Sequence, residues 1–295
     1  LILFVSFVFV QKANGLEDFN FNITSIEILE DGNVFKGINK GIITTNDGLT
    51  IEADTFEYNK ALNIFKAKGN IKIEDAFKKY IIYSDNLTYI KNDEIINTLG
   101  NSKAFYKNGI IIKADIFEYK KINNILYAKN DVTVNYPIKD YFISTEGLKY
   151  FRDEEYVITE GKTNALIKSK FKFDSENVLF SIKKDQLSSE KKSRVQDNNS
   201  NIYLIDRFNY SLKNDLLKGE NIIGISNYNL PKSDKIYFSS AIINLDKNEF
   251  TAKDTEFNSH NEVFGNPENN PRLKGISSKK VGNLTTINKG IFTSC

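Results

Sequence analysis

A ten-residue pattern recurs along this chain about every thirty residues. Residues 110–119 read Ile-Ile-Ile-Lys-Ala-Asp-Ile-Phe-Glu-Tyr, and residues 49–58 read Leu-Thr-Ile-Glu-Ala-Asp-Thr-Phe-Glu-Tyr. The aromatic residue that closes each copy stands at positions 58, 89, 119, 150, 180 and 210, so the intervals are 31, 30, 31, 30 and 30. So regular a period indicates a repeat architecture, in which each unit buries its apolar face against its neighbours.

Each copy predicts a β-strand whose alternation is broken once. Ile112 and Ala114 share one face, but Phe117 and Tyr119 would lie on the opposite face of an unbroken strand, because the step from 114 to 117 is odd. A bulge or bend at Asp115 would return both apolar pairs to one side. The same offset occurs at Asp54, Asp85 and Glu146. We therefore predict an antiparallel sheet that bends at one place in every repeat and curls into a trough or flattened barrel.

The rest of the chain fits an all-β fold. Residues 16–48 alternate with strand periodicity around a turn at residues 30–33, and glycine- or asparagine-rich turns follow each aromatic residue by eleven positions, at 69–70, 100–101, 130–131 and 161–162. Residues 185–201 are polar and unpatterned, which predicts a loop or linker, and residues 258–283 are also loop-like. No apolar stripe of helical period persists over three turns.

Little in the sequence points to bond chemistry. The single histidine, His260, lies in a polar stretch, which favours a solvated loop residue, and there is no His/Cys cluster for a metal, no nucleophile elbow and no phosphate-binding loop. The repeated acids occur once per repeat among apolar neighbours, so we expect them to accept hydrogen bonds from backbone donors at the bend and not to bind Ca²⁺. Forty basic and 38 acidic residues argue against a nucleic-acid partner.

The apolar face has two interpretations. It is either an ordinary packed core or a groove that holds acyl chains between the halves of a curled sheet. The residues assigned to this inner face are Ile51, Ala53, Phe56, Tyr58, Ile82, Leu87, Tyr89, Ile112, Ala114, Phe117, Tyr119, Leu148 and Tyr150.

The first fifteen residues match an export signal. Residues 1–10 are almost entirely apolar but too few to span a bilayer as a helix, and small residues follow at Ala13 and Gly15. The chain contains no Met, so we expect residues 1–15 to be a truncated signal peptide. The lone thiol, Cys295, is a candidate for pairing with a cysteine outside this sequence.

The motif Ala-Asp-x-Phe-x-Tyr at residues 53–58, followed by Ala-Lys-Gly-Asn-Ile-Lys-Ile at 67–73, resembles the OstA-like domain of lipopolysaccharide-transport proteins. The likeness spans roughly residues 40–255. It implies an elongated, open antiparallel β-jellyroll that carries lipopolysaccharide (LPS) with its acyl chains inside, and no catalysis or cofactor. Residues 270–275 and 287–295 are similar to the junction between periplasmic domain and barrel in the LptD family of LPS-assembly proteins, where a cysteine at the position of Cys295 forms disulfides.

The resemblance therefore implies a division of the chain into a signal peptide at 1–15, a jellyroll at 16–257 with a polar insertion at 185–201, and a loop-rich junction at 258–295 toward a C-terminal β-barrel. It implies a place on the periplasmic side of the outer membrane. It implies three partners: LPS, an LptA-like bridging protein that pairs with the edge strand near Phe19 to Ile28, and an LptE-like lipoprotein on the barrel. A soluble or tethered bridge component, and a β-solenoid surface protein or polysaccharide-acting enzyme, are the alternatives.

Overall fold

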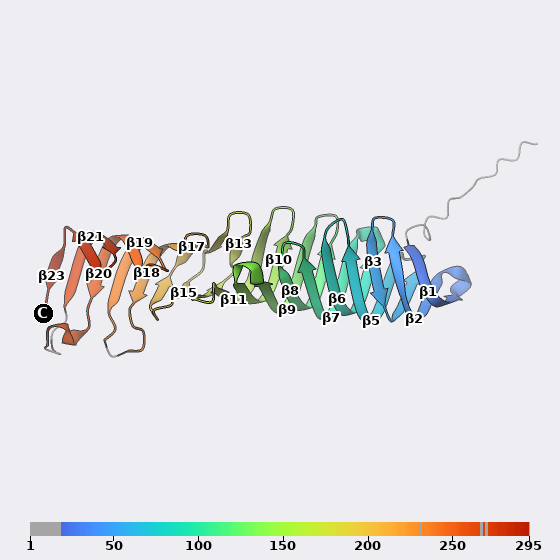
Figure 1. The fold of residues 1–295 in the computed structure, drawn as a ribbon, viewed down its shortest axis with the longest axis horizontal. Coiled ribbons are helices and arrows are strands. Elements are labelled where there is room, and N and C mark those ends of the chain that lie inside the picture. Colours follow the sequence, from blue (N-terminus) through green and yellow to red (C-terminus); the bar gives the residue numbers. More distant parts are fainter. Residues whose placement is uncertain (1–18, 231, 266–267, 269–270, 295) are drawn as a thin grey trace, which may run out of the picture. The chain divides into compact units, whose positions relative to one another are not determined.

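The computed structural model describes residues 19–230, 232–265, 268 and 271–294. The expected signal segment 1–15 and Cys295 lie outside these residues. The chain divides into two compact units, Leu1–Lys107 and Asn108–Cys295, a boundary that the sequence did not suggest. Each unit is an antiparallel β-sheet fold in which the strands follow one another largely in chain order (Figure 1). The all-β class is therefore confirmed, and the antiparallel pairing excludes a parallel solenoid.

The described part of the first unit contains seven strands and two short 3₁₀ helices. They are β1 (Phe19–Leu29), η1 (Glu30–Gly32), β2 (Val34–Thr45), β3 (Leu49–Ala53), β4 (Thr55–Asn59), β5 (Ile64–Asp75), β6 (Tyr80–Ile90), η2 (Lys91–Asp93) and β7 (Ile95–Tyr106).

The described part of the second unit contains the remaining strands and two more 3₁₀ helices. They are β8 (Ile111–Lys120), β9 (Ile125–Tyr136), η3 (Pro137–Lys139), β10 (Tyr141–Phe151), β11 (Tyr156–Ile167), β12 (Phe171–Glu176), β13 (Leu179–Ser181), β14 (Gln186–Ser189), β15 (Ser193–Gln196), β16 (Ile202–Ile205), β17 (Arg207–Ser211), β18 (Leu216–Ile225), β19 (Lys235–Asn244), β20 (Glu249–Asn258), η4 (Asn261–Phe264), β21 (Arg272–Val281), β22 (Leu284–Asn288) and β23 (Ile291–Thr293).

Long strands in both units contribute to two layers. In the first unit, residues 41–44 of β2 pair with β3, whereas residues 34–37 pair with β4. In the second unit, residues 162–167 of β11 pair with β12, whereas residues 156–158 pair with β13. Within each unit we call the layer that contains β3 or β12 the first layer, and the layer that contains β4 or β13 the second layer. The strands cross between layers where they bend, which is the architecture of a jellyroll.

The broken alternation predicted for β8 is confirmed. Ile112, Ala114, Phe117 and Tyr119 are all buried, so both apolar pairs face the interior. The extra residue of the β-bulge lies on the neighbouring strand, β9. Lys113 pairs with Thr133 and Ile116 pairs with Lys129, so β9 advances by four residues where β8 advances by three. The extra residue of β9 lies at residues 130–131, both of which have positive φ. The bend is therefore shared between the acid and the turn-like pair opposite it.

At two of these bends the acid accepts a hydrogen bond from an asparagine side chain, whereas the sequence predicted backbone donors. Asp54 Oδ2 accepts a hydrogen bond from Asn70 Nδ2 at 2.7 Å, and Asp85 Oδ2 accepts one from Asn101 Nδ2 at 2.7 Å. The glycine before each asparagine leaves room for the acid, since a Cβ at Gly69 would lie 2.5 Å from Asp54 Oδ2.

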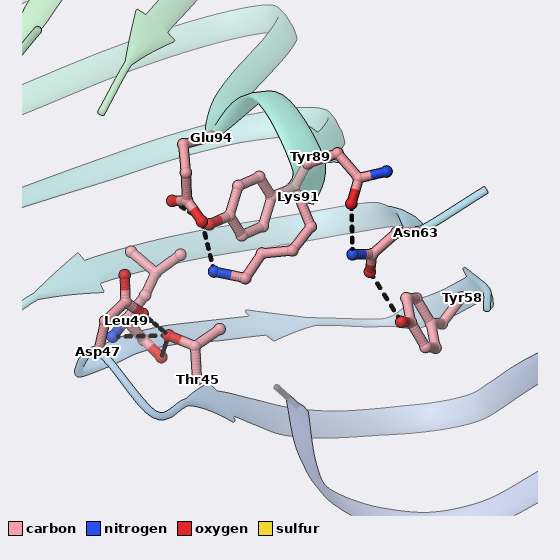
Figure 2. Close-up of polar contacts among 9 residues, drawn as sticks. Thr45, Asp47, Leu49, Tyr58, Asn63, Tyr89, Lys91 and Glu94 are labelled. Atoms are coloured by element: carbon pink, nitrogen blue, oxygen red, sulfur yellow. Dashed lines mark hydrogen bonds and ion pairs between the residues drawn. The ribbon is translucent and has the colours of Figure 1, made fainter. Parts of the chain in front are cut away.

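Aromatic side chains fill the space between the layers. In the first unit Phe19, in the first layer, lies 5.0 Å from Tyr58 of the second layer, measured between ring centroids. In the second unit Phe173 of β12 lies 4.8 Å from Tyr210 of β17. The tyrosine hydroxyls lie at the hairpin turns. There the Tyr58 hydroxyl donates a hydrogen bond to Asn63 Oδ1 at 2.8 Å (Figure 2). The repeat-closing tyrosines thus join the core to the turns.

Two segments expected to be loops contain strands. Residues 185–201 include β14 and β15. The two aliphatic residues of this segment, Leu187 and Val195, are fully buried. Buried hydroxyls there are satisfied within the sheet, as Ser193 Oγ lies 2.8 Å from Ser175 Oγ. Single apolar residues in a polar run gave too weak a period to predict a strand. Residues 258–295 likewise contain β21, β22 and β23, which extend the sheet.

Candidate functional site

The thirteen residues assigned to the inner face lie in the interior of their units. Each is at most 7% exposed. Ile51, Ala53, Phe56, Tyr58, Ile82, Leu87 and Tyr89 belong to the first unit, and Ile112, Ala114, Phe117, Tyr119, Leu148 and Tyr150 to the second. Within each unit the burial of these residues agrees with the inward-facing positions that the alternation predicted. Their side chains are closely packed, so lipid binding at these positions stays a prediction.

Three of the tyrosines at these positions, Tyr58, Tyr89 and Tyr119, donate hydrogen bonds to polar side chains five residues further on. Tyr89 donates to Glu94 Oε2 at 2.6 Å, in the same way as Tyr58 to Asn63 (Figure 2). Tyr119 and Tyr210 repeat the contact with Asn124 and Asp215, each at 2.7 Å. The Tyr-x₄-(Asn/Glu/Asp) spacing is visible in the sequence and would have identified these partners.

A cavity of about 640 Å³ lies between the layers at the C-terminal strands of the second unit. Ile236, Phe257 and Leu273 line it from the first layer, and Phe250 and Ile287 from the second. These five side chains are half-buried, in contrast to Phe173, which is 1% exposed in β12. The volume is within the range of about 300–1,000 Å³ typical of ligand pockets.

Several small residues lie in the wall of this cavity. Gly224 of β18 and Gly290, which precedes β23, contribute to the lining without side chains, and Ser226 adds only a hydroxymethyl group. The apolar side chains of the lining suit an apolar ligand, and the polar residues Asn201, Asp234, Lys235, Asn248 and Lys280 also contribute to the lining. The cavity was not predicted from the sequence, because the inner-face positions after residue 210 repeat the motif only loosely.

A polar cluster fixes one rim of the cavity. Asp234, which lines it, accepts hydrogen bonds from the backbone N–H of His260 at 2.9 Å and from Ser259 Oγ at 3.1 Å. His260 Nδ1 lies 2.8 Å from the same carboxylate oxygen, Asp234 Oδ1. The histidine expected in a solvated loop is therefore a structural partner of Asp234, and the pair anchors the segment after β20.

Three lysine–aspartate pairs connect the free ends of the two layers of the second unit. Lys139 Nζ lies 2.9 Å from Asp185 Oδ1, and Lys168 Nζ lies 2.7 Å from Asp215 Oδ1. Lys170 Nζ lies 3.1 Å from Asp246 Oδ1. We call this line of contacts the mouth of the second unit.

Buried tyrosines stand directly behind the mouth. Burial raises the pKa of the Tyr141 hydroxyl, and the negative charges of Asp185 and Asp215 raise it further. Burial also raises the pKa of Tyr210, whose hydroxyl donates to Asp215. Both groups therefore stay neutral at physiological pH and close the apolar interior against the charged rim.

The described residues contain no group of three or more His, Cys, Asp or Glu side chains that could hold a metal ion. Among the same residues, no helix has the length and apolar character to cross a membrane.

Comparisons with known proteins give a distant structural likeness. No protein-family model matches the chain, and no curated protein matches it. Among solved structures, the chain is similar to LptH of Pseudomonas aeruginosa, described as the LptA-homologous periplasmic component of a lipopolysaccharide transport device. The TM-score is 0.35 and the identity 13%, over 40% of this chain and 87% of LptH.

Proposed function

We propose that this chain is the periplasmic part of an outer-membrane LPS-assembly protein of the LptD kind, which receives LPS from a bridging protein and passes it to a barrel. The observation that carries the proposal is the apolar space between the two layers of the second unit, which opens into a cavity of about 640 Å³. The repeated Ala-Asp-x-Phe-x-Tyr motif, which resembles the OstA-like domain, supports the choice of LPS.

The mechanism is a difference in solvation and needs no bond chemistry. Each methylene removed from water contributes about 0.8 kcal/mol, so a chain of a dozen methylenes gains roughly 10 kcal/mol before the cost of ordering it. Phe250, Phe257 and Leu273 supply the apolar contacts that replace water around the chain. A polar glycan head would remain in solvent.

The two parts of the interior play different roles in this proposal. The cavity is an open space among half-buried side chains, so acyl chains enter there without displacing them. At the closely packed positions, such as Phe117 and Leu148, entry requires the two layers to separate. The inner face of the repeats is then a path that opens as the lipid moves, and the cavity is the place where the lipid rests.

The edge of β1 is the proposed contact for an LptA-like bridging protein. Among the described strands β1 pairs with β2 alone, so no described strand covers its other edge. Ile26 and Ile28 are exposed on this strand. An added strand from a partner would pair with the backbone groups of that edge and cover these side chains.

Site-specific photo-crosslinking with purified LPS tests the proposal. A crosslinker at Phe250, in the cavity, should capture LPS, whereas one at its exposed neighbour Thr251 should not. Phe117 and Glu118 form the same matched pair in the packed region. Capture at Thr251 and Glu118 without capture at Phe250 would refute an internal lipid path.

A further inference from the structure

The mouth of the second unit joins turns that belong to different layers. Lys139 lies in the turn between β9 and β10, and Lys168 lies in the turn between β11 and β12; both turns end the first layer. Asp185 and Asp215 lie in the turns before β14 and β18, which end the second layer. A chain that enters the interior between these turns must separate the pairs.

The lysines of the mouth stand between apolar interior and water. Behind them Tyr141, Phe171 and Tyr210 are buried. The side chains of Lys139, Lys168 and Lys170 are themselves 35%, 33% and 48% exposed, so their ammonium groups are reachable from solvent. If an acyl chain lies between the layers, the head group of the lipid lies next to these three lysines.

The turns joined by the three pairs carry an excess of positive charge. Their sequences are Pro-Ile-Lys-Asp at 137–140, Lys-Ser-Lys at 168–170, Ile-Lys-Lys-Asp at 182–185, Leu-Lys-Asn-Asp at 212–215 and Asp-Lys-Asn at 246–248. Seven lysines stand against four aspartates, a net charge of +3 on turns of a chain whose whole net charge is +2. The turns around the mouth therefore carry more lysines than aspartates, and the excess positive charge favours an anionic ligand.

We propose that Lys139, Lys168 and Lys170 bind the phosphate group of an acylated ligand, exchanging their aspartate partners for it as the mouth opens. This inference rests on the proposed function and adds to it the anionic head group of the ligand. Opening the mouth leaves three ammonium groups without their carboxylates. A phosphate offers them charge-assisted hydrogen bonds of equal or greater strength, whereas a neutral head group does not.

Two lipids that differ only in a phosphate test this inference: 1-myristoyl lysophosphatidic acid and 1-monomyristoylglycerol. Their dissociation constants are measured by calorimetry on the full chain and on two triple variants. One is Lys139→Gln/Lys168→Gln/Lys170→Gln. The other is Asp185→Asn/Asp215→Asn/Asp246→Asn. A matched control, Lys113→Gln/Lys129→Gln/Lys162→Gln, removes three exposed lysines of the same unit away from the mouth.

The expected results separate a phosphate site from a simple closure. The lysine triple should weaken lysophosphatidic acid binding at least tenfold and leave monomyristoylglycerol unchanged or tighter. The aspartate triple should tighten lysophosphatidic acid binding, because it frees the lysines. Equal binding of both lipids to the unaltered chain would overturn the inference but leave the lipid path intact. The same holds if the lysine triple weakens the binding of both lipids equally, or if the control triple weakens lysophosphatidic acid binding as much as the lysine triple does. Binding of neither lipid would refute the proposed function as well.

Discussion

At three of the bends a glycine, Gly69, Gly100 or Gly161, leaves space for the acid of the neighbouring strand, and Gly100→Ala tests this. Gly100 has φ +85°, and a Cβ there would lie 2.7 Å from Asp85 Oδ2. An L-residue in this backbone region costs about 1–2 kcal/mol. Displacing Asp85 also breaks its hydrogen bond with Asn101, worth roughly another 1–2 kcal/mol for a charged acceptor. We therefore expect Gly100→Ala to lower the free energy of unfolding by about 2–4 kcal/mol.

A double-mutant cycle and a matched glycine separate the two contributions. Gly32→Ala has a similar φ of +90° with nothing within 4 Å of the new Cβ, so it should cost only the backbone share of about 1–2 kcal/mol. In Asp85→Ala the hydrogen bond is already lost, so adding Gly100→Ala should cost about 1 kcal/mol less than in the unaltered chain. Urea unfolding followed by tyrosine fluorescence provides the values. Strict additivity, or equal costs at Gly32 and Gly100, would refute this account of the bend.

Two further predictions concern the core of the second unit. Phe173→Ala should cost about 3–5 kcal/mol because Phe173 fills the space between the layers, whereas Phe142→Ala, at a residue 43% exposed, should cost less than about 1 kcal/mol in the same urea assay. The raised pKa values of Tyr203 and Tyr210 keep these hydroxyls protonated in the folded state, so their stabilising effect is complete below pH 10 and is lost above it, by about 1.4 kcal/mol per pH unit for each tyrosine. Tyr210→Phe should flatten the fall in stability between pH 10 and 11, and the exposed Tyr83→Phe should not; identical slopes would contradict the prediction.

The repeat period and the break in alternation predict most of the fold, because both are properties of the chain itself. The step from Ala114 to Phe117 was enough to locate the bend, and burial of both residues confirms it. The sequence of β8 alone could not show that the extra residue lies on β9, because this depends on which strand pairs with β8. Strand pairing likewise decides that Asp54 meets Asn70, sixteen positions away.

The candidate site was only partly predictable. Inner-face positions such as Tyr58 and Leu148 follow from alternation, so their burial could be foreseen. The cavity could not, because an unfilled volume depends on how Gly224 and Gly290 lie relative to Phe257 and Leu273 in three dimensions. The mouth was missed for a similar reason: Lys139 and Asp185 are 46 residues apart, and only the folding of two layers brings them together.

The central claim, that acyl chains occupy the space between the layers, can be tested with a single tryptophan. The chain has none, so Phe257→Trp places the only indole in the cavity, and Phe142→Trp provides a half-exposed control in the same unit. Bromine on the acyl chains of a bound lipid quenches indole fluorescence only at close contact. We predict saturable quenching of the tryptophan at position 257 and little at position 142. Equal quenching at both positions, or none at 257, would contradict it.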